Sequence, residues 1–207
     1  MNLSKLFKIQ KQLDDRIVKE KKLEGQNLLN KKILALQVEL GELANEWRGF
    51  KFWSNDQEPK RNKREKCPVC NGNGIVSMGE GVRGIKVCLY CDNGGIKTTD
   101  PLLEEYVDTV HFTLSAGLEI EIKHEIFPEP INYGDVVIQF NELFGQISYF
   151  ASVLKRENEW EEIESEYERI WSLLFGLAGL LGFTWEEIEQ GYIAKNKINH
   201  ARQESGY

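Results

Sequence analysis

Apolar residues recur at helical spacing along most of this 207-residue chain, and this periodicity limits the fold more than any other feature. Near the start, apolar side chains are three or four residues apart, at Leu6, Ile9, Leu13 and Ile17. This spacing places them on one face of a helix over about residues 4–22. Outside residues 54–99, no segment shows the alternation that is typical of a strand. The sequence therefore predicts an all-α helical bundle.

The same reasoning predicts the remaining helices. Asp100 is suited to cap a helix, and Pro101 fits the first turn of that helix. Thr184 and Glu187 have the spacing of a capping box, which predicts a last helix to about residue 203. The other helices are expected over about residues 27–48, 136–154 and 160–181.

Residues 54–99 interrupt the helical pattern. The segment begins with a polar and basic stretch and continues with closely spaced Gly and Cys residues. Within it, residues 74–77 and 85–87 are expected to pair as a short hairpin. We therefore predict one domain over residues 1–207, with residues 54–99 as an insertion between helices.

All four cysteines lie in this insertion, as two CxxC pairs: Cys67, Cys70, Cys88 and Cys91. Because the N-terminal residues are charged and we expect no secretory signal, this pattern favours a metal site over disulfides. Four thiolates at such spacing are typical of a tetrahedral structural Zn²⁺ site. A closed shell of four Cys ligands leaves no open position, so this metal is not expected to be catalytic.

The charge of the chain restricts its partners. A formal net charge of −7 argues against a general nucleic-acid coat, because phosphate backbones are bound by clustered Lys and Arg. The basic run at residues 60–66 is either a solvated linker or a contact for nucleic acid or protein. No stretch approaches the ~20 apolar residues of a membrane span, and we expect a soluble cytoplasmic protein.

Acidic residues stand at helical spacing on two of the expected helices. Glu39, Glu42 and Glu46 share one face of the first, and Glu105 and Asp108 are three residues apart on the second. If the two helices pack antiparallel, their carboxylates meet and repel one another unless a cation is bound. Oxygen ligands of this kind suit Mg²⁺ or Mn²⁺. The alternative is that each pair is an ordinary exposed pair of acids.

Other polar or aromatic residues also have two interpretations. Gln10 lies on an apolar helix face and is either bonded to a neighbour or available to a ligand. His111 and the aromatic cluster at residues 47–53 fit either a core or a binding pocket. The last helix carries a polar stripe that fits either a solvated helix end or an anion site. Its members are Tyr192, Lys195, Asn199 and Arg202, with Asn196 beside them.

The segments ELGELANEWRGFKFW (residues 39–53) and EEYVDTVHF (residues 104–112) resemble the dimeric dUTPases of the all-α NTP pyrophosphatase superfamily. The signature of that superfamily is ExxE on one helix and ExxD on the next. The resemblance covers most of the chain but not the Cys insertion. It implies Mg²⁺-dependent hydrolysis of dUTP, and also of dUDP, to dUMP by a homodimer. The GLAGLLGF segment (residues 176–183) would suit close helix packing in such a dimer.

The resemblance also implies roles for individual residues. Glu39, Glu42, Glu105 and Asp108 would bind Mg²⁺, and Glu39 would activate the attacking water, with Glu42 or Glu46 as alternatives. Gln10 would contact the uracil edge, and Asp14 stands where some relatives have Asn. The remaining implied substrate contacts are Trp47, Trp53, His111, Phe112, Tyr192, Lys195, Asn196, Asn199 and Arg202.

Two other functions fit the sequence. The first is a related pyrophosphatase that acts on another nucleotide, such as dCTP. The second is a binding module in which the Cys insertion and the basic run contact nucleic acid or protein, and the acidic bundle is a scaffold.

Overall fold

The computed structural model describes residues 3–77, 84–91, 94–122, 126, 128–156 and 159–205. These residues form helices and four short strands. The helices are α1 (Leu3–Glu20), α2 (Leu29–Trp47), α3 (Pro101–Glu119), α4 (Val136–Val153), α5 (Trp160–Leu181) and α6 (Trp185–Glu204). The strands are β1 (Lys63–Lys66), β2 (Ile75–Ser77), β3 (Ile85–Val87) and β4 (Ile96–Thr99). The predicted all-α fold is confirmed.

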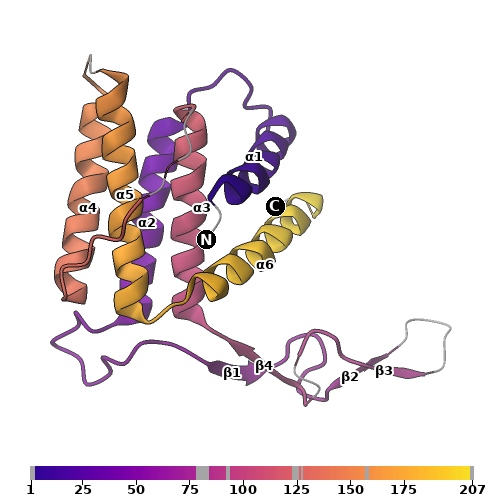
Figure 1. The fold of residues 1–207 in the computed structure, drawn as a ribbon. Coiled ribbons are helices and arrows are strands. Elements are labelled where there is room, and N and C mark those ends of the chain that lie inside the picture. Colours follow the sequence, from indigo (N-terminus) through magenta and orange to yellow (C-terminus); the bar gives the residue numbers. More distant parts are fainter. Residues whose placement is uncertain are drawn as a thin grey trace.

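Helices α2 and α3 run antiparallel at the centre of the bundle, as Figure 1 shows. The α4–α5 pair covers one side of them, while α1 and α6 lie across the other side. The core between these layers is apolar and includes fully buried Leu40, Val110, Leu143 and Trp171. The antiparallel packing of α2 and α3 brings the two acidic segments side by side.

Side chains fix the starts of three helices. The Asp100 carboxylate accepts from the Leu103 N–H at 3.1 Å, and Pro101 occupies the first turn of α3. Thr184 and Glu187 form the predicted capping box at α6. Helix α2 is capped at its C-terminus by Arg48, which adopts the left-handed conformation although the next residue is a glycine. Gly49 is required for a different reason, since a Cβ there would overlap the Trp47 ring.

Some apolar residues of the helices are not in the core. Leu34 is 61% exposed and Val38 is 49% exposed on α2. In contrast, much of the GLAGLLGF segment is buried within its own chain, and a Cβ at Gly176 would overlap the Ile131 carbonyl oxygen. These buried positions of α5 are therefore unavailable for contact with a second subunit.

The Cys segment forms a slender arm at one end of the bundle, which we call the ribbon (residues 63–99; Figure 1). The predicted hairpin is present as β2 paired antiparallel with β3. A second antiparallel pair, β1 with β4, forms the base of the ribbon. The sequence does not predict this pair, because the β1 side chains are charged and all exposed and so show no alternation.

Part of the basic run anchors the ribbon to the bundle. Arg61 forms an ion pair with Asp100 at 2.8 Å and lies 4.8 Å from the centre of the Phe183 ring. Lys60 pairs with Asp56 at 2.8 Å. These cations therefore have structural partners rather than forming one open basic surface. Among the described residues, no helix has the length and apolar character that crossing a membrane requires.

Candidate active site

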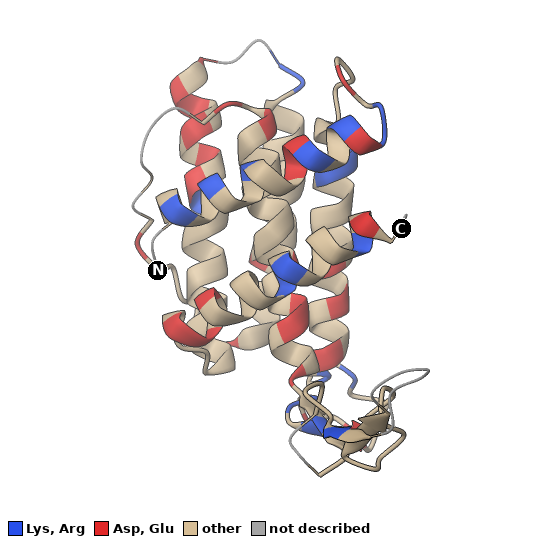
Figure 2. Cartoon of the chain, turned by 90° about the vertical axis from the view of Figure 1, so that its right-hand side faces the viewer, with Lys and Arg blue, Asp and Glu red and all other residues tan. Residues whose placement is uncertain are grey.

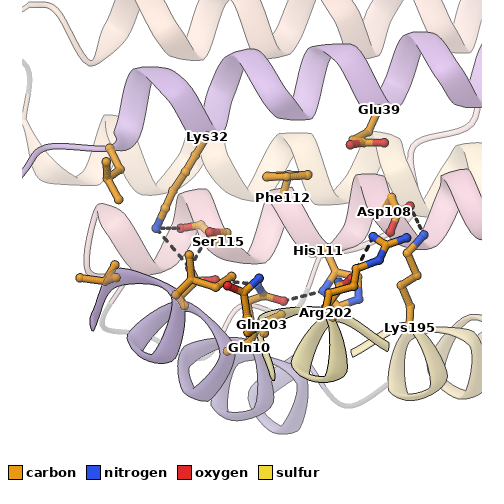
Figure 3. Close-up of a pocket in the computed structure, with 16 residues that line it drawn as sticks. Gln10, Lys32, Glu39, Asp108, His111, Phe112, Ser115, Lys195, Arg202 and Gln203 are labelled. Atoms are coloured by element: carbon orange, nitrogen blue, oxygen red, sulfur yellow. Dashed lines mark hydrogen bonds and ion pairs between the residues drawn. The ribbon is translucent and has the colours of Figure 1, made fainter. Parts of the chain in front are cut away.

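A cavity of about 360 Å³ lies where α1 and α6 cross α2 and α3 (Figure 3). Each of the four helices contributes polar side chains to its wall. Those predicted from sequence are Gln10, Asp14, Glu39, Asp108, His111, Phe112, Lys195, Asn199 and Arg202. The fold thus brings together residues that are up to 192 positions apart in the chain.

Three carboxylates meet between α2 and α3. One oxygen each from Glu39, Glu42 and Glu105 lies within 4.8 Å of the others. Glu39 and Glu105 are half-buried and Glu42 is exposed. Burial, and then the charges of Asp108 and Glu42, raise the pKa of Glu39 to about 7. Burial and the neighbouring acids Asp108, Glu42 and Glu39 raise the pKa of Glu105 to about 7 as well.

Asp108 belongs to the same acidic centre but has a different partner. Its carboxylate accepts a hydrogen bond from the Lys195 ammonium of α6. Burial raises the pKa of Asp108, and the bond to Lys195 acts in the opposite direction. Glu46 lies one turn beyond Glu42 and is not part of the three-residue cluster.

These acids fit a divalent cation. Their oxygens are hard ligands, which Mg²⁺ prefers. Burial and then the neighbouring acids raise the pKa values of Glu39 and Glu105, and both effects disfavour the charged carboxylates. A bound cation would remove this repulsion.

Farther along the cavity, between Lys32 and Asp108, Gln10 is held by three hydrogen bonds (Figure 3). Its Nε2 donates to Asp14 Oδ1 at 2.7 Å, so its Oε1 faces the opposite way. That oxygen accepts from the Tyr192 hydroxyl at 2.7 Å and lies 2.7 Å from His111 Nδ1. Burial and then the Lys195 charge lower the pKa of His111 to about 3, so the ring is neutral. Its Nδ1 carries the proton, because a carboxamide oxygen can only accept.

Asp14 connects this network to a lysine that the sequence analysis missed. Lys32 on α2 forms ion pairs with Asp14 at 3.2 Å and with Glu119 at 2.7 Å. The Ser115 hydroxyl donates a hydrogen bond to Asp14 Oδ2, the oxygen that Lys32 contacts, at 2.5 Å. Lys32 precedes Glu39 by seven residues, so two helical turns put both on one face. This spacing was the feature of the sequence from which Lys32 could have been predicted as a site residue.

The polar stripe of α6 divides between the cavity and the interior. Lys195, Asn199 and Arg202 line the cavity. Tyr192 is fully buried and acts on the cavity through Gln10, and its ring stacks on His111 with centroids 4.1 Å apart. Asn196 is also buried, and its Nδ2 has no hydrogen-bond partner among the described residues.

The two tryptophans lie away from this cavity in the single chain. Trp47 packs against Phe140 of α4, with ring centroids 5.8 Å apart. Trp53 is 66% exposed and meets Phe52 edge-on at 5.0 Å. Phe112 is the aromatic residue that lines the cavity.

The four cysteines converge in the ribbon. The Sγ atoms of Cys67 and Cys88 are 3.8 Å apart, as are those of Cys70 and Cys91. A disulfide requires about 2.05 Å, so these pairs are not bonded. A tetrahedron with metal–sulfur bonds of about 2.3 Å has edges of about 3.8 Å. The Gly74 N–H also donates to Cys70 Sγ at 3.2 Å, which helps hold a thiolate.

A family model described as dUTPase matches residues 2–66 and 76–207. The unmatched residues 67–75 contain the first CxxC pair and lie within the predicted insertion. No curated protein matches the chain.

Proposed function

The chain belongs to the dUTPase family, and from this premise we propose that it converts dUTP to dUMP and pyrophosphate, and dUDP to dUMP and phosphate, using Mg²⁺. Membership of the family makes the protein a dUTP diphosphatase. The observation that carries the finer proposal is one cavity that is lined both by a carboxamide held in place by hydrogen bonds and by Glu39 and Asp108 of the acidic centre. Such a cavity suits a base joined to a metal-bridged phosphate chain.

Four acids would hold Mg²⁺: Glu39, Glu42, Glu105 and Asp108. When bound, the ion offsets the charge of the phosphate oxygens and lowers the pKa of coordinated water. The acids fix its position from two antiparallel helices. Asp108 is also bonded to Lys195, which links the acidic centre to α6.

Glu39 is the proposed general base, because it belongs to the acidic cluster and also lines the cavity. Its carboxylate orients a water molecule and accepts a proton as the water oxygen bonds to the α-phosphorus. The bond from that phosphorus to the bridging oxygen then breaks, and pyrophosphate leaves. Glu42 is exposed and Glu46 lies outside the cluster, which makes them weaker candidates.

Gln10 is the proposed reader of the base. Its Oε1 accepts hydrogen bonds from Tyr192 and His111, and one N–H of its amide donates to Asp14. The second N–H remains to donate to a carbonyl oxygen. Uracil offers a carbonyl at position 4, where cytosine carries an amino group that cannot accept. Phe112 lines the same cavity and offers an aromatic face to the base or sugar.

Lys195, Asn199 and Arg202 are the proposed contacts to the phosphates. They line the cavity from α6, with Lys195 directly at the acidic centre. Guanidinium and ammonium groups make charge-assisted bonds to phosphate oxygens. The four ribbon cysteines are proposed to hold a structural Zn²⁺, and the protein is proposed to act as a homodimer.

Hydrolysis of separate nucleotides tests this function. Release of pyrophosphate would be measured from dUTP, dCTP, dTTP and UTP, each with and without added Mg²⁺. We expect Mg²⁺-dependent release with a strong preference for dUTP. A preference for dCTP would replace the proposed substrate, and the absence of hydrolysis with every nucleotide would overturn the proposal.

A further inference from the structure

A second cavity, of about 470 Å³, lies between the base of the ribbon and helices α3 and α6. We call it the ribbon cavity. From the ribbon it is lined by Tyr90, Lys97, Thr98 and Thr99. From the helices its polar lining includes Asp100, Glu104, Lys195 and Arg202. Figure 2 shows Lys and Arg positions on both the ribbon and the neighbouring α6.

The ribbon cavity adjoins the candidate active site. Lys195 and Arg202 line both cavities, and Lys195 is bonded to Asp108 of the acidic centre. A ligand held at the acidic centre therefore meets the same two cations that form one wall of the ribbon cavity. A phosphate chain extending past Lys195 and Arg202 would enter it.

Lys97 is the cation that the ribbon adds to this wall. It is half-buried, and its Nζ lies 4.8 Å from the centre of the Tyr90 ring and 3.4 Å from the Tyr90 hydroxyl. Among the described residues, no carboxylate forms an ion pair with Lys97. The ring therefore positions the ammonium without neutralising it.

The remaining lining suits an anion of limited size. Thr98 and Thr99 add hydroxyl donors from β4, whose register is fixed by pairing with β1. Asp100 is already neutralised by Arg61 and caps α3. Glu104 is the one acid of this lining without a described ion-pair partner, and Lys97 offers a positive charge in the same lining, while Lys195 is bonded to Asp108.

We propose that the ribbon cavity binds the terminal diphosphate of the nucleotide, the group that leaves as pyrophosphate, with Lys97 as a contact from the ribbon. This inference rests on the proposed function. It assigns the Cys segment a part in substrate binding, because the fold of the ribbon places Lys97 in the wall of a cavity that helix α6 also lines. Lys97 is a binding residue here and takes no part in proton transfer.

The test compares Lys97→Ala with Lys86→Ala in the full-length, zinc-loaded protein. Lys86 is an exposed cation on β3 of the same ribbon and does not line the cavity. Three quantities would be measured: inhibition by added pyrophosphate, KM for dUTP and dUDP, and calorimetric binding of pyrophosphate with Mg²⁺. Zinc content would be determined for each variant to confirm an intact ribbon.

We expect Lys97→Ala to weaken pyrophosphate inhibition and binding by about tenfold, the size expected for one lost charge-assisted contact. KM should rise more for dUTP than for dUDP, because dUDP has one phosphate fewer beyond the cleaved bond. Lys97→Arg should retain pyrophosphate binding, and Lys86→Ala should match the wild type.

Equal pyrophosphate binding by Lys97→Ala and Lys86→Ala, with full zinc content, would overturn this inference and leave the proposed function standing. Failure of the wild type to hydrolyse dUTP would instead overturn the proposed function and, with it, this inference.

Discussion

The Lys195 ammonium on α6 donates a hydrogen bond to the Asp108 carboxylate on α3, at the edge of the acidic centre. Among the described residues, Glu39, Glu42 and Glu105 have no comparable cationic partner. One lysine therefore couples the last helix of the chain to the acids that are proposed to bind Mg²⁺. The charge of Asp108 is central to this arrangement, because it pairs with Lys195 and also raises the pKa of Glu39 and Glu105.

Replacing Asp108 by Asn tests whether this charge is needed for activity. Asparagine keeps the size of the side chain but provides a weaker metal ligand and a neutral partner for Lys195. We expect kcat for dUTP to fall by about 100-fold or more. The unfolding temperature should not fall much, because burial already disfavours the charged form. Glu161→Gln, an exposed acid in the first turn of α5, is the control. Full activity of Asp108→Asn would contradict the proposed site.

Glu39 and Glu105 predict how stability depends on pH without added Mg²⁺. Their pKa values are near 7 when folded and near 4.5 when unfolded, so unfolding releases protons between these values. The contribution of these two groups to the free energy of unfolding is greatest below pH 4.5, and it is lost as the pH rises through 7. We expect a lower unfolding temperature at pH 8 than at pH 6, and Mg²⁺ should reduce the difference. Glu105→Gln should also reduce it, and scanning calorimetry of both proteins would measure this.

The sequence predicted the helices well because their signals are local. Capping at Asp100 and Thr184 depends on residues three positions apart, and the structure has both caps. The β1–β4 pair was missed because its strands are separated by the whole ribbon and have no alternating pattern. The exposure of Leu34 could not be predicted either, since periodicity indicates an apolar helix face but not which element covers it.

The candidate site was predicted in part for similar reasons. The acids of α2 and α3 were predicted to meet because one spacing recurs on two helices, and three of them do meet. The hydrogen bond from Tyr192 to Gln10 and the ion pair of Lys32 with Asp14 depend on how α1 crosses the neighbouring helices. No pattern within one helix reports such a crossing. The positions of Trp47 and Trp53 outside the cavity could not be predicted either, because they also depend on how the helices pack.

Gln10→Ala tests the reading of the base. The substitution removes the proposed donor to uracil and leaves Tyr192 and His111 without their acceptor. We expect the preference for dUTP over dCTP, measured as a ratio of kcat/KM values, to fall by at least about tenfold. Loss of the buried acceptor should also cost about 1–3 kcal/mol of stability. Gln190→Ala, an exposed glutamine on α6, should change neither quantity. An unchanged preference would exclude Gln10 as the reader.

Cys88→Ser tests the proposed zinc site. One zinc per chain is expected in the wild type by elemental analysis. The substitution removes one of four thiolates and should lower the zinc content strongly, because structural zinc sites need a complete shell. Helix content by circular dichroism should remain close to that of the wild type, since the ribbon lies outside the core of the bundle (Figure 1). Unchanged zinc content would show that the metal, if present, is bound elsewhere.

The proposed homodimer requires an apolar surface, and α2 and α4 provide candidates. Leu34 and Val38 of α2 are exposed one turn apart, and Ile138 and Tyr149 of α4 are also exposed. The Gln37 amide donates to the Ser148 hydroxyl at 3.2 Å, so these parts of the two helices are neighbours. Leu34, Val38 and Tyr149 are close in sequence to this contact, and we propose that they contribute to the interface, since exposed apolar surface is typical of one.

Val38→Glu places a charge on this surface, and burying an unpaired charge between subunits is unfavourable. We expect the variant to be monomeric, or to dissociate at much higher concentrations than the wild type, in sedimentation velocity experiments. Val69→Glu makes the same change at an exposed ribbon position and should leave the dimer intact. If Val38→Glu remains a dimer as tight as the wild type, the interface lies on another surface. If the wild type itself is monomeric, the homodimer proposal is wrong.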